Sequence, residues 1–318
     1  MTDTNQSQDA ALRVLLREHF GADVGEPHPL AGGFFSRAFA ATATGREYVI
    51  RLNTAVHARE SFAKDDYAWR HFASPALPIP RIVATGETAS GSYAISERAA
   101  GNTLDACSVE ERRAVLPALL DTVEAVGLSD VRPSRGYGDW GSDGNGRFAS
   151  WHDFLASMTA NHPDGYYKDW HRLYHESFLE RDLYEVVYLR MLQLAAHCPN
   201  YRALVHNDLH FENIVSDGQR ITGVLDWANA LYGDLLYDIA WLTWQAAHPG
   251  WWYDDGAQLL QARFGATPQY AERIACYQLH IGLDHLRYYA WNNKRADYDF
   301  CRAWLLRLLT ADAVGITE

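Results

Sequence analysis

A short polar loop followed by a predicted β-hairpin constrains the fold of this 318-residue chain more than any other feature. The loop follows apolar Leu204 and Val205 and reads His206-Asn207-Asp208-Leu209-His210-Phe211-Glu212-Asn213. Two apolar runs, 214–215 and 221–225, come next, and the Asp217-Gly218 pair between them is typical of a hairpin turn. Such a hairpin turns the chain back so that Asn213, before its first strand, lies beside Asp226, after its second.

The side chains around this hairpin have the chemistry of a phosphoryl-transfer centre. Amide and carboxylate oxygens are ligands that Mg²⁺ prefers, so Asn213 and Asp226 are predicted to hold magnesium on nucleotide phosphates. Asp208 is predicted to orient an acceptor hydroxyl and take its proton. His206 is predicted to brace the loop through hydrogen bonds. The loop spacing alone also arises by chance, and the hairpin with Asp226 is what favours the functional interpretation.

The first hundred residues predict a small five-stranded antiparallel sheet with one or two helices. Helices are predicted from Ser7 to Phe20 and over 61–72. Strands are predicted at 48–52, 81–84 and 93–96, with a strand-loop-strand over 30–39. The bend of that last segment carries Gly32 and Gly33 and leads to Ser36. Its backbone N–H groups are predicted to approach phosphates closely.

One predicted strand carries a candidate phosphate-binding cation. Side chains alternate along a strand, so Val49 and Arg51 share a face. Val49 is predicted to cover an adenine, and Arg51 to reach the phosphates as a permanently charged, bidentate donor. Asp65 or Asp66 of the next helix is predicted to pair with Arg51, and the sequence does not distinguish them. An exposed strand arginine is the alternative.

After the predicted sheet, residues 97–101 are expected to form a hinge, in which the backbone of Glu97 and Ala99 bonds the adenine edge. Beyond it the pattern becomes helical. Ser108 and Glu111 form a predicted capping box that opens a helix to about residue 126. The glycine-rich segment 136–146 is predicted to be a loop. Further helices are predicted at 151–160, 169–198, 234–247, 256–264, 268–290 and 297–311.

Composition narrows the class of partner. The formal net charge of −12 repels nucleic acid and anionic membranes and attracts a cationic small molecule. The chain shows neither a secretory signal nor an apolar run of membrane-spanning length, and its four cysteines lack metal-ligand spacing. We therefore expect a cytoplasmic protein, a monomer or weak dimer, that binds neither nucleic acid nor a membrane.

These motifs together make the chain similar to the aminoglycoside phosphotransferases of the protein-kinase-like superfamily, from about Leu30 to Asp299. Residues 205–213 match the family's catalytic loop, and residues 225–227, 233–234 and 237–238 match its metal-binding segment. The resemblance implies an α+β, two-lobed protein-kinase-like fold. A small antiparallel β-sheet N-lobe (1–96) would join a larger, mainly helical C-lobe (102–318) through the hinge. It also implies ATP, with GTP left open, Mg²⁺, and an aminoglycoside hydroxyl as acceptor.

Residues 48–51, 70–80 and 281–286 are most similar to family members that phosphorylate hygromycin B, which favours that acceptor and a role in antibiotic resistance. The pair Leu209-His210 and the aromatic stretch 162–175 differ from those members. Candidate acceptor contacts are His210, Asp234, Asp238 and Asp284, although Asp238 could equally be a structural cap and Asp284 a solvated helix residue. The alternatives are a kinase for a macrolide, an amino alcohol or a sugar, and a nucleotide-binding pseudokinase.

Overall fold

The chain forms two compact units, seen in a computed structural model that describes residues 12–30, 36–89, 91–161, 163, 165–246 and 256–314. The first unit is Met1–Thr122 with Phe211–Asn229, and the second is Val123–His210 with Ala230–Glu318. The predicted lobes are continuous in sequence, whereas the segment carrying Asn213 and Asp226 belongs to the unit that contains the N-terminal sheet. The hinge at 97–101 stays a prediction.

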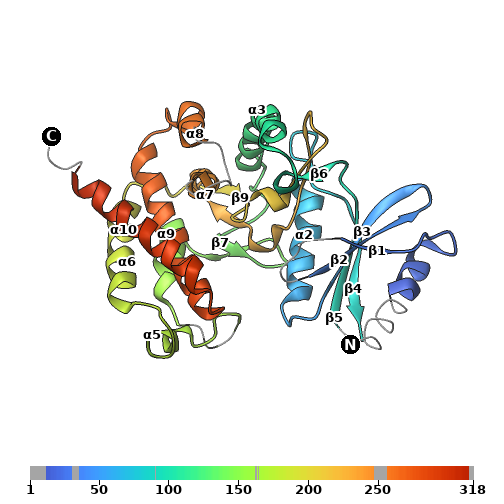
Figure 1. Ribbon diagram of the computed structural model, residues 1–318, viewed down its shortest axis with the longest axis horizontal. Helices are drawn as coiled ribbons and strands as arrows, with labels where there is room; N and C mark the ends of the chain where they lie inside the picture. Colours follow the sequence, from blue (N-terminus) through green and yellow to red (C-terminus); the bar gives the residue numbers. More distant parts are fainter. Residues whose placement is uncertain are drawn as a thin grey trace. The chain divides into compact units, whose positions relative to one another are not determined.

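The first unit contains a five-stranded antiparallel sheet, as predicted, in the order β1-β2-β3-β5-β4. Its strands are labelled in Figure 1. The strands β1 to β5 are His28–Leu30, Arg37–Ala43, Arg46–Asn53, Ile82–Thr88 and Gly91–Glu97. One face packs against the helical residues 12–20 through Leu16, Ile50 and Ile95, all fully buried. The opposite face, which includes Ala94, packs against helix α2 (Ala58–Phe72). Arg51 pairs in register with Ala94 and therefore faces α2.

The predicted hairpin also lies in the first unit and is confirmed. Strands β10 (Ile214–Ser216) and β11 (Ile221–Val224) pair antiparallel, with Ile214 opposite Val224. Gly218 takes a φ of +89° at the turn, where a side chain would be strained. β6 (Asn102–Thr103) extends this sheet to the order β11-β10-β6. The other elements are η1 (Leu104–Ala106), η4 (Phe211–Asn213), η5 (Trp227–Asn229) and the start of α3 (Val109–Gly127).

The capping box at the start of α3 is also confirmed. The backbone N–H of Ser108 donates to Glu111 Oε2 at 2.7 Å, and the Glu111 N–H donates back to Ser108 Oγ at 3.2 Å. These reciprocal bonds satisfy N–H groups that have no partner within the first helical turn.

A four-stranded sheet in the order β8-β7-β12-β9 belongs to the second unit. Its strands β7, β8, β9 and β12 are Tyr137–Trp140, Gly146–Phe148, Ala203–Val205 and Leu231–Gly233. The prediction that 136–146 is a loop was therefore wrong, because β7 and β8 form a short hairpin there. Its glycines hide the strand pattern but allow close pairing: a Cβ at Gly136 would lie 2.1 Å from the Gly146 carbonyl oxygen.

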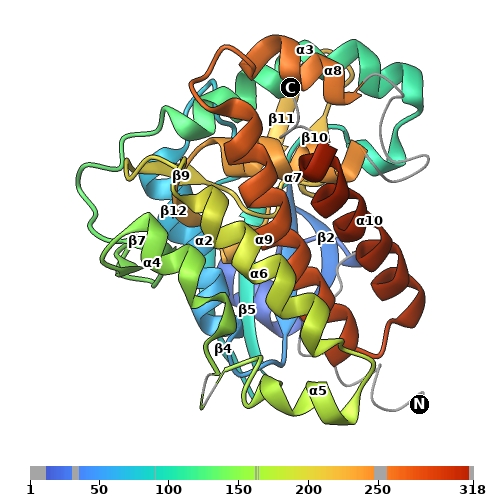
Figure 2. The same ribbon diagram turned by 90° about the vertical axis from the view of Figure 1, so that its left-hand side faces the viewer.

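The remaining elements of the second unit are helical. They are α4 (Trp151–Ala156), η2 (Ser157–Thr159), η3 (Trp170–Arg172), α5 (Leu173–Glu176), α6 (Arg181–Ala195), α7 (Leu236–Ala246), α8 (Gly256–Phe264), α9 (Tyr270–Trp291) and α10 (Arg295–Val314). Helices α6 and α9 pack side by side (Figure 2). No helix within the described ranges is both long and apolar enough to cross a membrane.

The prediction of one helix over 169–198 was wrong, because the chain breaks between α5 and α6. Ser177 adopts an extended conformation, and its hydroxyl donates to the Leu173 carbonyl while accepting the N–H of Leu179. A serine side chain that bonds the backbone in this way competes with helical hydrogen bonds.

Candidate active site

The strand arginine of the first unit forms a buried ion pair with a helical aspartate. Arg51 Nη2 lies 2.5 Å from Oδ2 of Asp65 in α2, and the two side chains are only 20% and 5% exposed. Burial acts to lower the pKa of Arg51, but the charges of Asp65 and Asp226 outweigh it and the net shift is upward. The guanidinium therefore stays charged and is held in one place.

Asp65 also fixes the backbone beside Asp226. Its Oδ1 accepts the N–H of Trp227, the residue after Asp226, at 2.7 Å. The neighbouring Asp66 instead accepts from Arg70 on the exposed side of α2, at 2.8 Å. The structure thus pairs Arg51 with Asp65 and not with Asp66. One carboxylate orients both the cation and the start of η5.

Asn213 and Asp226 stand together at the open end of the β10–β11 hairpin. The Leu225 N–H donates to the Asn213 carbonyl at 2.8 Å. Asp226 is the next residue after Leu225, so its backbone lies close to that of Asn213. Asp226 has a φ of +59°, a left-handed conformation that costs energy in residues other than glycine and concentrates at functional sites. An amide and a carboxylate oxygen at one hairpin end are a donor set that fits Mg²⁺.

The part of the predicted catalytic loop that lies in the second unit is held by a buried carboxylate. Asp238 is fully buried in α7, and its two oxygens accept the backbone N–H groups of His206 and Asn207, each at 2.8 Å. Asn207 has a φ of +61°, and its side-chain oxygen accepts from Trp241 Nε1 at 3.2 Å. This arrangement fixes the backbone that presents Asp208. It makes Asp238 a structural clamp and hides it from an acceptor.

Asp208 itself remains accessible, with 21% of its side chain exposed. Its N–H donates to Nδ1 of the buried His206 at 3.3 Å, the bracing contact predicted for that histidine. His210 Nε2 lies 3.3 Å from Asp208 Oδ1. The loop therefore presents a carboxylate with a fixed backbone and an imidazole beside it.

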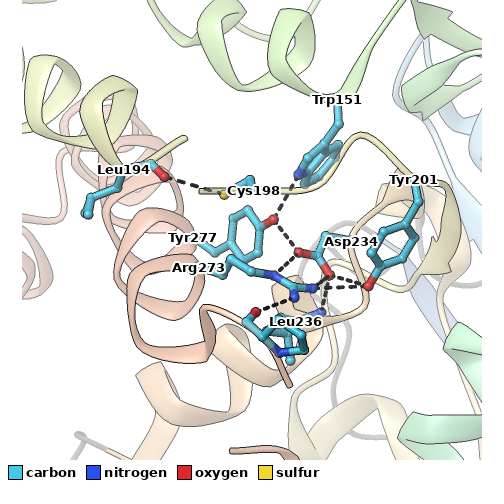
Figure 3. A network of polar contacts seen from close by, with 9 residues as sticks. Trp151, Leu194, Cys198, Tyr201, Asp234, Leu236, Arg273 and Tyr277 are labelled. Carbon is cyan, nitrogen blue, oxygen red and sulfur yellow. Dashed lines mark hydrogen bonds and ion pairs between the residues drawn. The ribbon is translucent and has the colours of Figure 1, made fainter. Parts of the chain in front are cut away.

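Asp234 lies in a buried polar network (Figure 3). Its oxygens accept from Arg273, from the hydroxyls of Tyr201 and Tyr277, and from the Leu236 N–H, and Tyr277 accepts in turn from Trp151 Nε1. The Arg273 and Asp234 side chains are 4% and 0% exposed. A carboxylate with this many buried donors is committed to structure, which disfavours the predicted acceptor contact at Asp234.

Asp284 differs from the other two acidic candidates because 44% of its side chain is exposed. It lies in α9 and pairs with Arg287 three residues later. His210 and Asp284 are therefore the two predicted acceptor contacts that solvent reaches. The contacts of Asp238 agree with the structural role that the sequence left open for it. Arg287 was not predicted, because the pattern of α9 does not reveal which polar residue meets a distant segment.

The predicted nucleotide contacts are placed in part. Gly32 and Gly33 lie outside the described residues. Ser36 Oγ accepts from Asn53 Nδ2 at 3.4 Å, and Val49 shares the α2-facing side of β3 with Arg51. Glu97 ends β5.

The segment after β5 packs closely on the β10–β11 hairpin. Thr222 Oγ1 donates to the Ala100 carbonyl at 2.6 Å. A Cβ at Gly223 would lie 2.7 Å from Ala99, so only glycine fits there without displacement. The backbone of Ala99 is thereby fixed against the strand that leads to Asp226.

The fold and these side chains define a class, the phosphotransferases with a protein-kinase-like fold. In such enzymes catalysis consists mainly of positioning and charge stabilisation around the transferred phosphoryl group. The chain belongs to the phosphotransferase enzyme family APH, whose sequence profile matches residues 26–275. The predicted family and fold class are confirmed.

Known proteins similar to the chain lie within the same family. Hygromycin-B 4-O-kinase of Escherichia coli is 34% identical over 268 residues, covering 81% of this chain and 72% of that protein. A thermostable mutant of aminoglycoside phosphotransferase APH(4)-Ia, in ternary complex with AMP-PNP and hygromycin B, aligns with a TM-score of 0.84 at 30% identity. That alignment covers 95% of this chain and 99% of the other. The gentamicin complex of APH(2")-IIa, at 16% identity and a TM-score of 0.66, shares the fold.

Proposed function

We propose that the chain transfers the γ-phosphoryl group of ATP to a hydroxyl of an aminoglycoside, namely hygromycin B, and so confers resistance to it. The observation that carries this proposal is the nearly full-length similarity to APH(4)-Ia, whose structure holds AMP-PNP and hygromycin B. The net charge of −12 supports a cationic acceptor. The same charge argues against nucleic acid and anionic membranes as partners, and the protein would act in the cytoplasm as a monomer or weak dimer.

In this proposal the first unit binds the nucleotide. Arg51, held by Asp65, contacts the phosphates, and the loop with Gly32, Gly33 and Ser36 offers backbone N–H groups to them. Val49 covers the adenine, while the backbone of Glu97 and Ala99 bonds its edge. GTP would use the same phosphate contacts. The choice between ATP and GTP therefore depends on the backbone groups of Glu97 and Ala99 that meet the base.

Asn213 and Asp226 would hold Mg²⁺, which when bound neutralises charge on the phosphates. Asp226 is suited to this role because Asp65 fixes the N–H of the following residue and Arg51 balances its charge. Asn213 is suited because the hairpin register fixes its backbone.

Asp208 positions the acceptor hydroxyl and accepts its proton as the phosphoryl group transfers. The clamp on His206 and Asn207 fixes the backbone that presents this carboxylate, so little reorganisation of the loop is needed during transfer. His210 and Asp284 contact the acceptor. Asp238 holds the backbone before Asp208, and Asp234 holds the buried network around Arg273, so neither contacts the acceptor.

The test is ADP release with Mg·ATP against a panel of hygromycin B, other aminoglycosides, a macrolide and choline. Asp208→Asn serves as the blank. We expect turnover with hygromycin B and a rate lowered by about 10³-fold or more in the variant. Turnover with the macrolide or choline alone would replace the aminoglycoside by another small hydroxyl compound. Nucleotide binding without turnover on any acceptor would favour a pseudokinase.

A further inference from the structure

A buried arginine in α9 has one acidic partner, and that partner reaches solvent. Arg287 Nη2 lies 2.5 Å from Asp284 Oδ1, and the two side chains are 10% and 44% exposed. Among the described residues, Asp284 is the one carboxylate that forms an ion pair with Arg287. A buried guanidinium needs an ionised partner, so Asp284 is held as a carboxylate in one orientation.

Two aromatic side chains, one just before η3 and one at its start, fix the Arg287 guanidinium. The guanidinium carbon lies 4.1 Å from the centre of the Tyr167 ring and 5.4 Å from that of Trp170. Trp170 is itself fully buried, and its Nε1 donates to the Ala160 carbonyl at 2.8 Å. Such cation–π contacts suit the planar, weakly hydrated guanidinium better than an ammonium. Arg287 thus connects the segment around Tyr167 to Asp284.

The ion pair occupies one oxygen of Asp284 and leaves the other available. Within the described part of the chain, no donor lies within hydrogen-bond distance of Asp284 Oδ2. Arg287 Nε is buried and without a partner among the described residues, whereas Asp284 Oδ2 belongs to a side chain that solvent reaches. Buried polar atoms of this kind are normally satisfied by water or a ligand. Asp284 therefore offers an oriented acceptor atom to a ligand ammonium or hydroxyl.

The same part of the second unit contains the candidate base. Trp241 donates to Asn207 of the catalytic loop, and its ring packs edge-on against His285 at 5.1 Å. Burial lowers the pKa of His285, while the charges of Asp284 and Asp208 both oppose that shift. The charges of Asp284 and Asp208 therefore both act on the same residue of α9, and both carboxylates belong to the second unit.

From these contacts we propose that Arg287 is a positioning residue for the acceptor: it holds Asp284 so that Oδ2 binds an ammonium or hydroxyl of the aminoglycoside. This inference rests on the proposed function and adds to it a specificity determinant that does not touch the substrate. The contribution falls on acceptor binding, because neither Arg287 nor Asp284 meets the transferred phosphoryl group.

Four variants test the inference: Arg287→Met, Arg287→Lys, Asp284→Asn and the double variant Arg287→Met/Asp284→Asn. We expect Arg287→Met and Asp284→Asn each to raise KM for hygromycin B by about tenfold or more. KM for ATP and kcat should stay within about twofold, the pattern of lost uniform binding. The double variant should raise KM for hygromycin B no more than either single variant does, because both substitutions remove the same contact to the acceptor. Arg287→Lys keeps the charge without the planar stacking and should be intermediate.

Arg302→Met is the matched control, because it removes another arginine–carboxylate pair of the second unit, with Glu180 at 2.6 Å. This control variant should leave KM for hygromycin B unchanged. Asp284→Asn keeps the test valid if Arg287→Met fails to fold. The Asp284 side chain is 44% exposed, so its replacement by asparagine should not disturb the fold. Calorimetric affinity for hygromycin B reports on binding independently of turnover. An unchanged KM and affinity in both Arg287→Met and Asp284→Asn would overturn the inference, while an inactive, non-binding wild type would overturn the proposed function with it.

Discussion

Replacing Asp65 by asparagine should damage both the stability of the first unit and the use of ATP. The carboxylate accepts from Arg51 at 2.5 Å and from the Trp227 N–H at 2.7 Å. An asparagine has one side-chain oxygen and no charge, so it can keep only one of these bonds. The variant leaves Arg51 without its ion-pair partner and frees the backbone next to Asp226.

The size of the effect follows from burial. A hydrogen bond to a charged group contributes about 1.5–3 kcal/mol, and two such bonds are at risk. The asparagine recovers part of one, and water can reach Arg51, whose side chain is 20% exposed. We therefore expect a loss of about 2–4 kcal/mol in the free energy of unfolding. We also expect kcat/KM for ATP to fall by about 10²-fold.

The neighbouring aspartate supplies a matched control on the same helix. Asp66 pairs with Arg70 at 2.8 Å, with side chains 26% and 59% exposed, so solvent screens the pair. Asp66→Asn should therefore cost no more than about 0.5 kcal/mol and leave KM for ATP unchanged. Denaturant unfolding and steady-state kinetics on both variants measure the contrast. Equal losses in the two variants, or no loss in Asp65→Asn, would refute the reasoning.

Three further predictions concern Asp238, Asp234 and Asn213. Burial raises the pKa of Asp238 to about 7 in the folded protein, above the value near 4 expected in the unfolded chain. The folded state therefore binds this proton more tightly. The resulting stabilisation is complete below about pH 4 and is lost as pH rises through about 7. We compare the unfolding free energy of the wild type with that of Asp238→Asn. Between about pH 4 and about pH 7 the wild type should lose at most about 4 kcal/mol relative to the variant. A difference between the two proteins that does not change with pH would contradict this prediction. Asp234→Asn leaves Arg273 buried and uncompensated and should cost about 3–5 kcal/mol without changing KM for hygromycin B, as thermal unfolding and kinetics can show. Asn213→Ala should raise the Mg²⁺ concentration for half-maximal ADP release, and an unchanged Mg²⁺ titration would remove Asn213 from the metal site.

Local patterns predicted the elements whose contacts are close in sequence. The Asp217-Gly218 hairpin and the Ser108–Glu111 capping box are fixed by neighbouring residues, so their patterns were sufficient. The break at Ser177 was missed because a single serine side chain ends the helix there. The β7–β8 hairpin was missed because its strands have only four and three residues and each strand contains a glycine.

The choice between Asp65 and Asp66 was within reach of the sequence. Phe62, Asp65 and Ala68 recur at intervals of three and lie on the buried stripe of α2. Asp66 instead lies four residues before Arg70, the spacing of an exposed helical ion pair. Weighing that periodicity would have selected Asp65.

Long-range polar pairs could not be predicted in the same way. Asp238 meets backbone groups 31 and 32 positions earlier, and Asp234 meets Arg273 39 positions later. Their burial depends on how the helices of the second unit pack, which one sequence does not specify. An acidic residue near a catalytic loop therefore looked like an acceptor contact when it supports the loop instead.

The central claim is that the enzyme transfers the γ-phosphoryl group of ATP to a hydroxyl of hygromycin B, with Asp208 positioning that hydroxyl and accepting its proton. Mass spectrometry of hygromycin B incubated with Mg·ATP and enzyme tests it most directly, with Asp208→Asn run in parallel and ATP binding checked by calorimetry. The account predicts that the wild type adds one phosphoryl group to the antibiotic, while the variant binds ATP and adds none. Unmodified antibiotic from an ATP-binding wild type, or equal modification by the variant, would contradict it.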